Sequence, residues 1–118
     1  MKPAARLLVS LAAVVMAASG CNYIKPIMYI DVANRSGEAM RNLEVKHPTG
    51  MFGLAELRDG QTHRYMAPIG APCKFKLDFE DRAGRKYSGD YDFGAKCPLE
   101  IALEVGPGLK VSPRQVRQ

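Results

Sequence analysis

Only a few side chains in this sequence are of the kinds that do chemistry, and they are widely spaced. The chain of 118 residues contains three cysteines, Cys21, Cys73 and Cys97, and two histidines, His47 and His63. A serine or cysteine nucleophile needs a base at a defined position, and the sequence contains no GxSxG elbow and no CxxC motif. Glycine-rich phosphate loops are also absent. We therefore expect a protein that is not an enzyme and that uses no cofactor.

Two groups of residues suggest a metal ion, but each has a simpler explanation. Four carboxylates fall on two neighbouring runs of alternating residues: Asp78, Glu80, Asp90 and Asp92. Hard cations favour such oxygen ligands, yet three lysines share the same face: Lys74, Lys76 and Lys86. Cross-strand charge pairs are therefore expected there. Methionines with the histidines would suit Cu(I), but nothing in the sequence brings them together: Met28, Met40, Met51 and Met66.

Residues 1–20 have the pattern of a secretory signal peptide. Lys2 and Arg6 precede an apolar run over residues 7–18, which ends in small residues. A helix over this run spans about 18 Å, which is too short for a bilayer core of about 30 Å. We expect the segment to be removed from the mature protein. A short membrane anchor and a buried core helix are the alternatives.

The end of this segment, Ala18-Ser19-Gly20-Cys21, resembles the lipobox of the bacterial lipoprotein class, in which small residues precede a cysteine. The resemblance implies that Cys21 receives a diacylglyceryl group on its sulfur and becomes the mature N-terminus, usually with a third acyl chain on its amine. Plain secretion, after a cut near Ala18 or Gly20, is the alternative.

The residue after the cysteine bears on which membrane holds the protein. In the lipoprotein class of enteric bacteria an aspartate at that position retains the protein in the inner membrane, and this chain has Asn22. The resemblance therefore implies an outer-membrane anchor facing the periplasm. Residues 21–26 would form the lipidated N-terminus and tether. Two or three acyl chains on one cysteine would hold the domain at the bilayer.

With Cys21 carrying lipid, Cys73 and Cys97 remain, and an oxidising periplasm would pair them as a disulfide. The bridge would close a loop of about 25 residues and stabilise the domain by about 3.5 kcal/mol in the chain-entropy model. A redox pair or a metal site is the alternative. However, no histidine lies near either cysteine in sequence.

Alternating apolar and polar residues predict strands through most of the remaining chain. The alternation is clearest in 73–80 and 85–93, and the turn between them at 81–84 predicts an antiparallel hairpin. Residues 51–58 fit either a short strand or an irregular connection. Five further runs have strand character: 27–33, 43–47, 61–67, 99–105 and 109–111.

This spacing of strands and turns predicts an all-β fold, a small antiparallel β-sandwich of the immunoglobulin-like or transthyretin-like kind, or a small barrel. We expect the sandwich over residues 27–112 and a flexible polar tail over 113–118. In the C-terminal half the apolar faces should share one core: Phe75, Leu77, Phe79, Tyr87, Tyr91, Leu99, Ile101 and Leu103. The charged faces should stay in water: Lys74, Lys76, Asp78, Glu80, Lys86, Asp90, Glu100 and Glu104.

The charge balance argues against a nucleic-acid partner. The whole chain has a formal net charge of +5, and removal of Lys2 and Arg6 lowers it to +3. The remaining basic residues are scattered, with no patch of interleaved basic and aromatic residues.

We expect a lipid-anchored envelope lipoprotein that acts as a non-enzymatic protein-interaction or assembly module, with an envelope protein as its partner. The alternative is a binder of an envelope ligand such as lipopolysaccharide, peptidoglycan or a metal ion. An exposed aromatic cluster or convergent charges in a cleft would favour the ligand binder. A charged face beside one uncovered edge strand would favour the interaction module.

Overall fold

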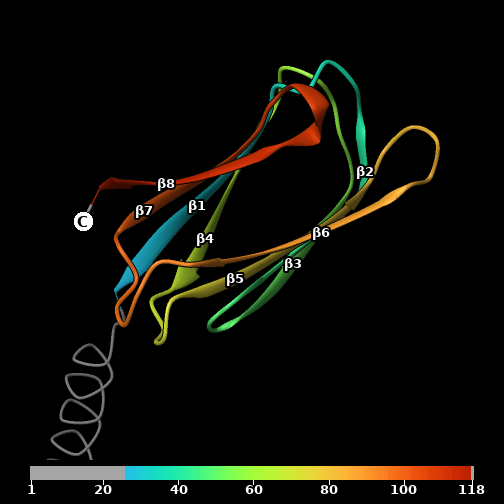
Figure 1. Cartoon of the computed structure of the whole chain (residues 1–118). Coiled ribbons are helices and arrows are strands. Elements are labelled where there is room, and N and C mark those ends of the chain that lie inside the picture. The colour runs from blue at the N-terminus through green and yellow to red at the C-terminus, as the bar shows by residue number, and fades with distance from the viewer. Residues whose placement is uncertain (1–25, 118) are drawn as a thin grey trace, which may run out of the picture.

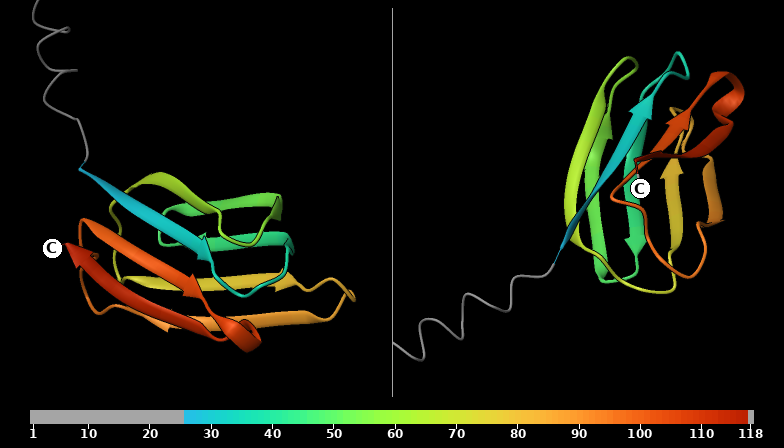
Figure 2. Two further views of the ribbon diagram at one scale, coloured as in Figure 1. Left: turned by 90° about the horizontal axis from the view of Figure 1, so that it is seen from above. Right: turned by 90° about the vertical axis from the view of Figure 1, so that its left-hand side faces the viewer.

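The computed structural model describes residues 26–117. These residues form two four-stranded sheets that pack face to face, as Figures 1 and 2 show. The strands are β1 (Ile27–Asn34), β2 (Met40–His47), β3 (Gly50–Leu57), β4 (Thr62–Pro68), β5 (Lys74–Glu80), β6 (Lys86–Asp92), β7 (Glu100–Val105) and β8 (Val111–Arg117), with a short 3-10 helix η1 (Pro107–Leu109) before the last. The predicted all-β sandwich is therefore confirmed.

One strand pair differs in direction from the prediction. Sheet A has the order β4-β1-β7-β8 and sheet B the order β3-β2-β5-β6. Neighbouring strands are antiparallel except β1 and β7, which run parallel. Parallel neighbours need a long connection, and here it includes β4 and all of sheet B. Side chains alternate between the two faces in the same way in parallel and antiparallel strands, so the sequence pattern could not show that β1 and β7 run parallel.

The predicted β5–β6 hairpin forms, with Lys74 opposite Asp92. Its turn is held by Asp81, whose carboxylate accepts hydrogen bonds from the backbone N–H groups of Ala83 (2.9 Å) and Arg85 (2.8 Å). These bonds, above all the one from Arg85, lower the pKa of the Asp81 carboxyl. The turn is therefore fixed by its own side chain as well as by its backbone.

The inward faces of both sheets supply one hydrophobic core. Most of the core predicted for the C-terminal half is confirmed. Tyr87 and Tyr91 are half-buried. Five others are buried: Phe75, Leu77, Phe79, Ile101 and Leu103. The predicted burial of Leu99 is wrong, because β7 begins only at Glu100 and Leu99 is 39% exposed. The charged residues predicted to face water are all exposed or half-buried.

In the N-terminal half, β2 begins at Met40 rather than at Leu43. Asn42 has a left-handed backbone (φ 50°), and the register with β5 shifts between Arg41 and Glu44. This bulge turns both Met40 and Leu43 into the core, which strict alternation cannot do. The ambiguous segment after β2 is a regular strand, β3.

The prediction of a flexible tail over residues 113–118 is wrong for 113–117, because these residues continue β8 and pair with β7. Gln118 lies outside the described residues. The composition of β8 was misleading because it is an edge strand: only Val111 is half-buried and the rest is exposed. Such a strand needs little apolar character to stay in a sheet.

The two ends of the sandwich are distinct. We name the end at which β1 begins the entry end and the opposite end the distal end. At the entry end the Thr49 hydroxyl donates to the Pro68 carbonyl (3.0 Å), which links the β2–β3 turn of sheet B to sheet A. The residues before 26, which include the predicted signal peptide and Cys21, lie outside the described residues. Among residues 26–117 no helix has the length and apolar character needed to cross a membrane.

Candidate functional site

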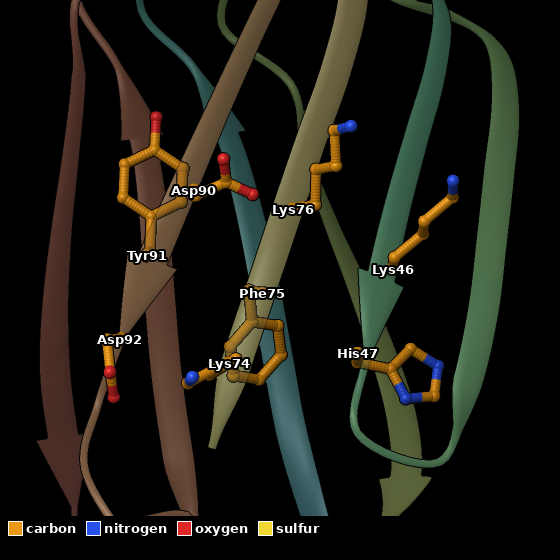
Figure 3. Close-up of a pocket in the computed structure, with 8 residues that line it drawn as sticks. All are labelled: Lys46, His47, Lys74, Phe75, Lys76, Asp90, Tyr91 and Asp92. Carbon is orange, nitrogen blue, oxygen red and sulfur yellow. The ribbon is translucent and has the colours of Figure 1, made fainter. Parts of the chain in front are cut away.

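A pocket of about 440 Å³ opens on sheet B toward the entry end (Figure 3). Residues of β2, β5 and β6 line it: Lys46, His47, Lys74, Phe75, Lys76, Asp90, Tyr91 and Asp92. The lining combines charged groups with aromatic rings. Burial, with a smaller contribution from the Asp90 carboxylate, raises the pKa of the Tyr91 phenol. The phenol therefore stays protonated at neutral pH.

The pocket charges on β5 and β6 are placed opposite one another but are not paired with each other. The register sets Lys74 beside Asp92 and Lys76 beside Asp90. Within residues 26–117, none of these four forms an ion pair within 4.0 Å. The opposite charges thus lie across from one another as expected, but the predicted charge pairs are not formed among these four residues. The ammonium groups of Lys74 and Lys76 are available to an anionic ligand, whereas that of Lys46 lies 3.9 Å from the Glu44 carboxylate.

Four rings form a cluster between β3 and β4, where the two sheets meet at one side of the sandwich. Phe52 stacks on Tyr65 with 4.2 Å between ring centroids, and His63 lies 5.8 Å from Phe52. His47 lies 5.7 Å from Tyr65. Phe52 is buried and the other three rings are half-buried. The cluster therefore closes the side of the core and offers little free aromatic surface.

His47 is the least satisfied member of the ring cluster. Its Nδ1 lies 3.3 Å from the Thr49 hydroxyl, whereas its Nε2 is buried and has no hydrogen-bond partner among residues 26–117. Burial lowers the pKa of the imidazole below its usual value of 6.5. The ring is consequently neutral at pH 7, and charging it would place an imidazolium in a poorly solvated site.

Four strands form the edges of the two sheets, and β3 differs from the others. Charged residues and prolines protect edge strands from pairing with other chains. The protecting residues are Arg64 and Pro68 on β4, Lys86, Asp90 and Asp92 on β6, and Pro113, Arg114 and Arg117 on β8. β3 carries an exposed charge only at Glu56, near its end, whereas residues 50–55 carry neither a charge nor a proline and Met51 is 53% exposed. The β3 edge is open to a further strand.

The outer face of sheet A carries a network around Arg64. Its guanidinium binds both oxygens of Asp31 (2.8 and 2.9 Å) and also contacts the Glu100 carboxylate. The same group lies over the Tyr29 ring, 4.7 Å from the centroid. Hydrogen bonding to Asp31 is the main cause that raises the pKa of Arg64. The side chains of Asp31 and Glu100 are 17% and 14% exposed, so Arg64 covers the acidic groups.

The predicted disulfide is present between Cys73 and Cys97, with 4.8 Å between the two Cα atoms. The backbone of Cys73 also exchanges hydrogen bonds with Phe93 and Gly94. As predicted, the bridge ties the open end of the β5–β6 hairpin to the next segment. The proposed lipidation residue, Cys21, lies outside the described residues.

The residues considered for metal binding are not brought together. Within residues 26–117, no group of three or more potential ligands among His, Cys, Asp and Glu could hold a metal ion. Met28 and Met40 are buried in the core, whereas Met51 and Met66 are exposed on different sheets.

Sequence reasoning missed both the ring cluster and the Arg64 network. Alternation does place Tyr29 and Asp31 on one face and His63 and Tyr65 on one face, and the structure confirms both groupings. What the sequence lacked was the strand order that sets β4 beside β1 and β3 over β4. Charge complementarity between Asp31 and Arg64 was the available signal, but many other acid–base pairs fit equally well.

Comparisons with known proteins bear on the fold. No protein-family model matches the chain, and no curated protein matches it. Among solved structures, the chain is similar to a protein from Eubacterium rectale determined by NMR, with a TM-score of 0.57 and 16% sequence identity. The match covers 80% of this chain and 92% of that chain. At this identity the similarity shows a shared sandwich fold.

Proposed function

We propose that the protein is a lipid-anchored envelope lipoprotein whose sandwich binds a partner protein, as a non-enzymatic interaction or assembly module. Cys21 carries the lipid, the outer membrane holds it, and the domain faces the periplasm. The uncovered edge of β3 is the observation that carries the interaction role. A charged outer face on sheet B lies beside this edge, which is the combination expected of a docking module.

The β3 edge suits addition of a strand from the partner. An extended segment would pair with the free backbone groups of β3, and side chains would then set specificity. Gly53 leaves the outward surface bare at the middle of the strand. A Cβ at Gly53 would lie 3.1 Å from the Leu43 carbonyl oxygen, so a side chain there would press on β2. The absence of a side chain at position 53 is thus also favoured by the close packing of β3 against β2.

Site-specific crosslinking in cells tests the interaction. A photoreactive residue at Met51, on the β3 edge, should form a discrete adduct with an envelope protein. The same probe at Ser88, which is exposed on the opposite edge strand β6, is the matched control. Ala55→Lys should abolish the Met51 adduct because a lysine protects the edge. Equal adducts from both positions, insensitive to Ala55→Lys, would contradict docking on β3.

Lipidation is tested separately. Cys21→Ala should release the mature domain into the periplasm or leave the uncleaved precursor at the inner membrane. Mass spectrometry of the wild-type N-terminus should find acyl chains on Cys21. A wild-type chain without lipid, together with unchanged membrane fractionation of a cleaved Cys21→Ala variant, would refute the anchor.

The unpaired lysines of the sheet B pocket favour a second candidate, the binding of an anionic envelope ligand. Lipopolysaccharide is a suitable probe because its phosphates match lysine ammonium groups. Lys74→Ala combined with Lys76→Ala should weaken its binding to the purified protein. Lys86→Ala, on the same face but outside the pocket, is the control. Equal affinity of all three proteins would exclude this pocket as the site.

A further inference from the structure

Exposed apolar side chains gather at the entry end of sheet A. Among residues 26–117, five large apolar side chains are exposed, and four of them lie there: Ile27 (51%), Met66 (59%), Leu99 (39%) and Val116 (48%). They come from β1, β4, the residue before β7, and β8, so they span the whole width of the sheet. Scattered exposed apolar residues need no explanation, but four of the five lie at one end of one sheet, which makes this end a candidate contact surface.

The ion-paired charges beside this patch leave their cations more exposed than their anions. In one row across the sheet, Tyr29 pairs with Met66 and Glu100, and Glu100 pairs with Arg117. The Glu100 carboxylate is largely covered, whereas the Arg117 side chain is 64% exposed. Arg64 covers the acids nearby and keeps its own guanidinium half-exposed. The patch therefore presents apolar groups and guanidinium groups, and it conceals its carboxylates.

The length of the chain before the sandwich places this end near the proposed anchor. From Cys21 to Ile27 there are six Cα–Cα steps, which span at most roughly 20 Å when fully extended. A domain on so short a tether cannot move far from the bilayer, and its entry end is the part held nearest. Contact with the bilayer surface would add apolar burial and attraction to lipid phosphates at little further entropic cost.

We propose that the entry end of sheet A rests on the phospholipid bilayer surface. Ile27, Met66, Leu99 and Val116 contact the headgroup region, and Arg64 and Arg117 meet lipid phosphates. This inference rests on the proposed lipidation of Cys21. It turns sheet A toward the bilayer at the entry end and sheet B, with the β3 edge, away from it.

A single-tryptophan experiment tests the contact, since the chain contains no tryptophan. Met66→Trp places an indole in the patch. Met51→Trp is the matched control, because Met51 is a methionine of similar exposure (53% against 59%) on the other sheet. Each full-length lipidated variant is reconstituted into vesicles of phosphatidylethanolamine and phosphatidylglycerol. The Met66→Trp emission should shift to shorter wavelength and be quenched by brominated lipids, whereas the Met51→Trp emission should resemble that of the protein in water.

The outcomes separate this inference from the anchor itself. Flotation of the wild-type protein with vesicles, together with its mass, reports lipidation. A wild type that carries no lipid overturns both proposals. A lipidated protein in which neither indole is shifted overturns the surface contact alone. Equal shifts of both indoles would overturn the assignment to sheet A, because the sandwich would then meet the bilayer by its end and not by this face.

Discussion

Asn34 is fully buried at the distal end, and its amide is completely hydrogen-bonded. Its Nδ2 donates to the carbonyls of Glu38 (2.7 Å) and Leu57 (2.8 Å). Its Oδ1 accepts from the backbone N–H (3.0 Å) and the hydroxyl (2.7 Å) of Ser36. One side chain thus joins the end of β1, the loop before β2 and the end of β3, which belong to different sheets.

Asn34→Ala should lower the free energy of unfolding by about 2–3 kcal/mol, since it leaves buried carbonyls without donors. Thr62→Ala, at an exposed position of the neighbouring strand β4, is the control and should change it by less than about 0.5 kcal/mol. Urea melts of the two variants give the comparison. Similar losses in both would mean that the Asn34 bonds contribute nothing specific.

His47 should make the stability depend on pH. Burial lowers its pKa in the folded state, so below about pH 6.5 the unfolded chain binds more protons at this position than the folded one. The free energy of unfolding should therefore fall as the pH drops through 6.5. Melts between about pH 7.5 and 5 should show this fall in the wild type and in His63→Gln, and a weaker one in His47→Gln. An identical fall in all three would assign it to other groups.

At the scale of elements, the two faces of β5 differ sharply in burial. Leu77 is 1% exposed, whereas Lys76 is exposed on the outer face. Leu77→Ala should cost about 2–5 kcal/mol through lost burial and a residual cavity. Lys76→Ala should cost less than about 0.5 kcal/mol. Equal midpoints in denaturant melts would contradict this assignment of a buried and an exposed face to β5.

The strand β8 is expected to protect β7. A chain that ends at Lys110 would leave β7 with an unpaired edge, and such edges pair with other chains. The truncated protein should be less stable to urea and should form dimers or larger species in size-exclusion chromatography. A truncated protein that is monomeric and as stable as the full chain would show that residues 111–118 do not support sheet A.

Elements with regular alternation could be predicted from the sequence, and irregular ones could not. β5 and β6 alternate without interruption, so their faces, hairpin and turn were all predictable. The bulge at Asn42 concealed the start of β2, and the exposed, polar character of β8 concealed that strand. Of the candidate sites, the disulfide was predictable from cysteine number. The β3 edge, the ring cluster and the sheet A patch depend on strand order, which alternation does not specify.

At the scale of the molecule, the disulfide joins the two sheets at the entry end. Cys73 directly precedes β5 of sheet B, and Cys97 lies shortly before β7 of sheet A. Both cysteines are buried, at 0% and 9% exposure, and belong to the core. The covalent link therefore reinforces the packing of one layer on the other, in addition to shortening the unfolded chain.

Cys73→Ser should lower the free energy of unfolding by about 2–5 kcal/mol, which is the range for native bridges in small exported domains. Reduction of the wild type should have a similar effect, and the variant should no longer respond to reductant. Chemical denaturation with and without dithiothreitol measures both. A wild type that melts identically under both conditions would show that the bridge contributes no stability.

The place of β1 in its sheet has a mechanical consequence. A lipid tether would enter the sandwich at Ile27, the first residue of a strand that has hydrogen-bonded neighbours on both sides, β4 and β7. Tension between the bilayer and a partner held on β3 would pull β1 along its own axis. The backbone hydrogen bonds that join β1 to β4 and to β7 would then be loaded in shear. Many bonds would share the force, and they would not break one at a time. The proposed attachment would therefore transmit load through two strand neighbours at once.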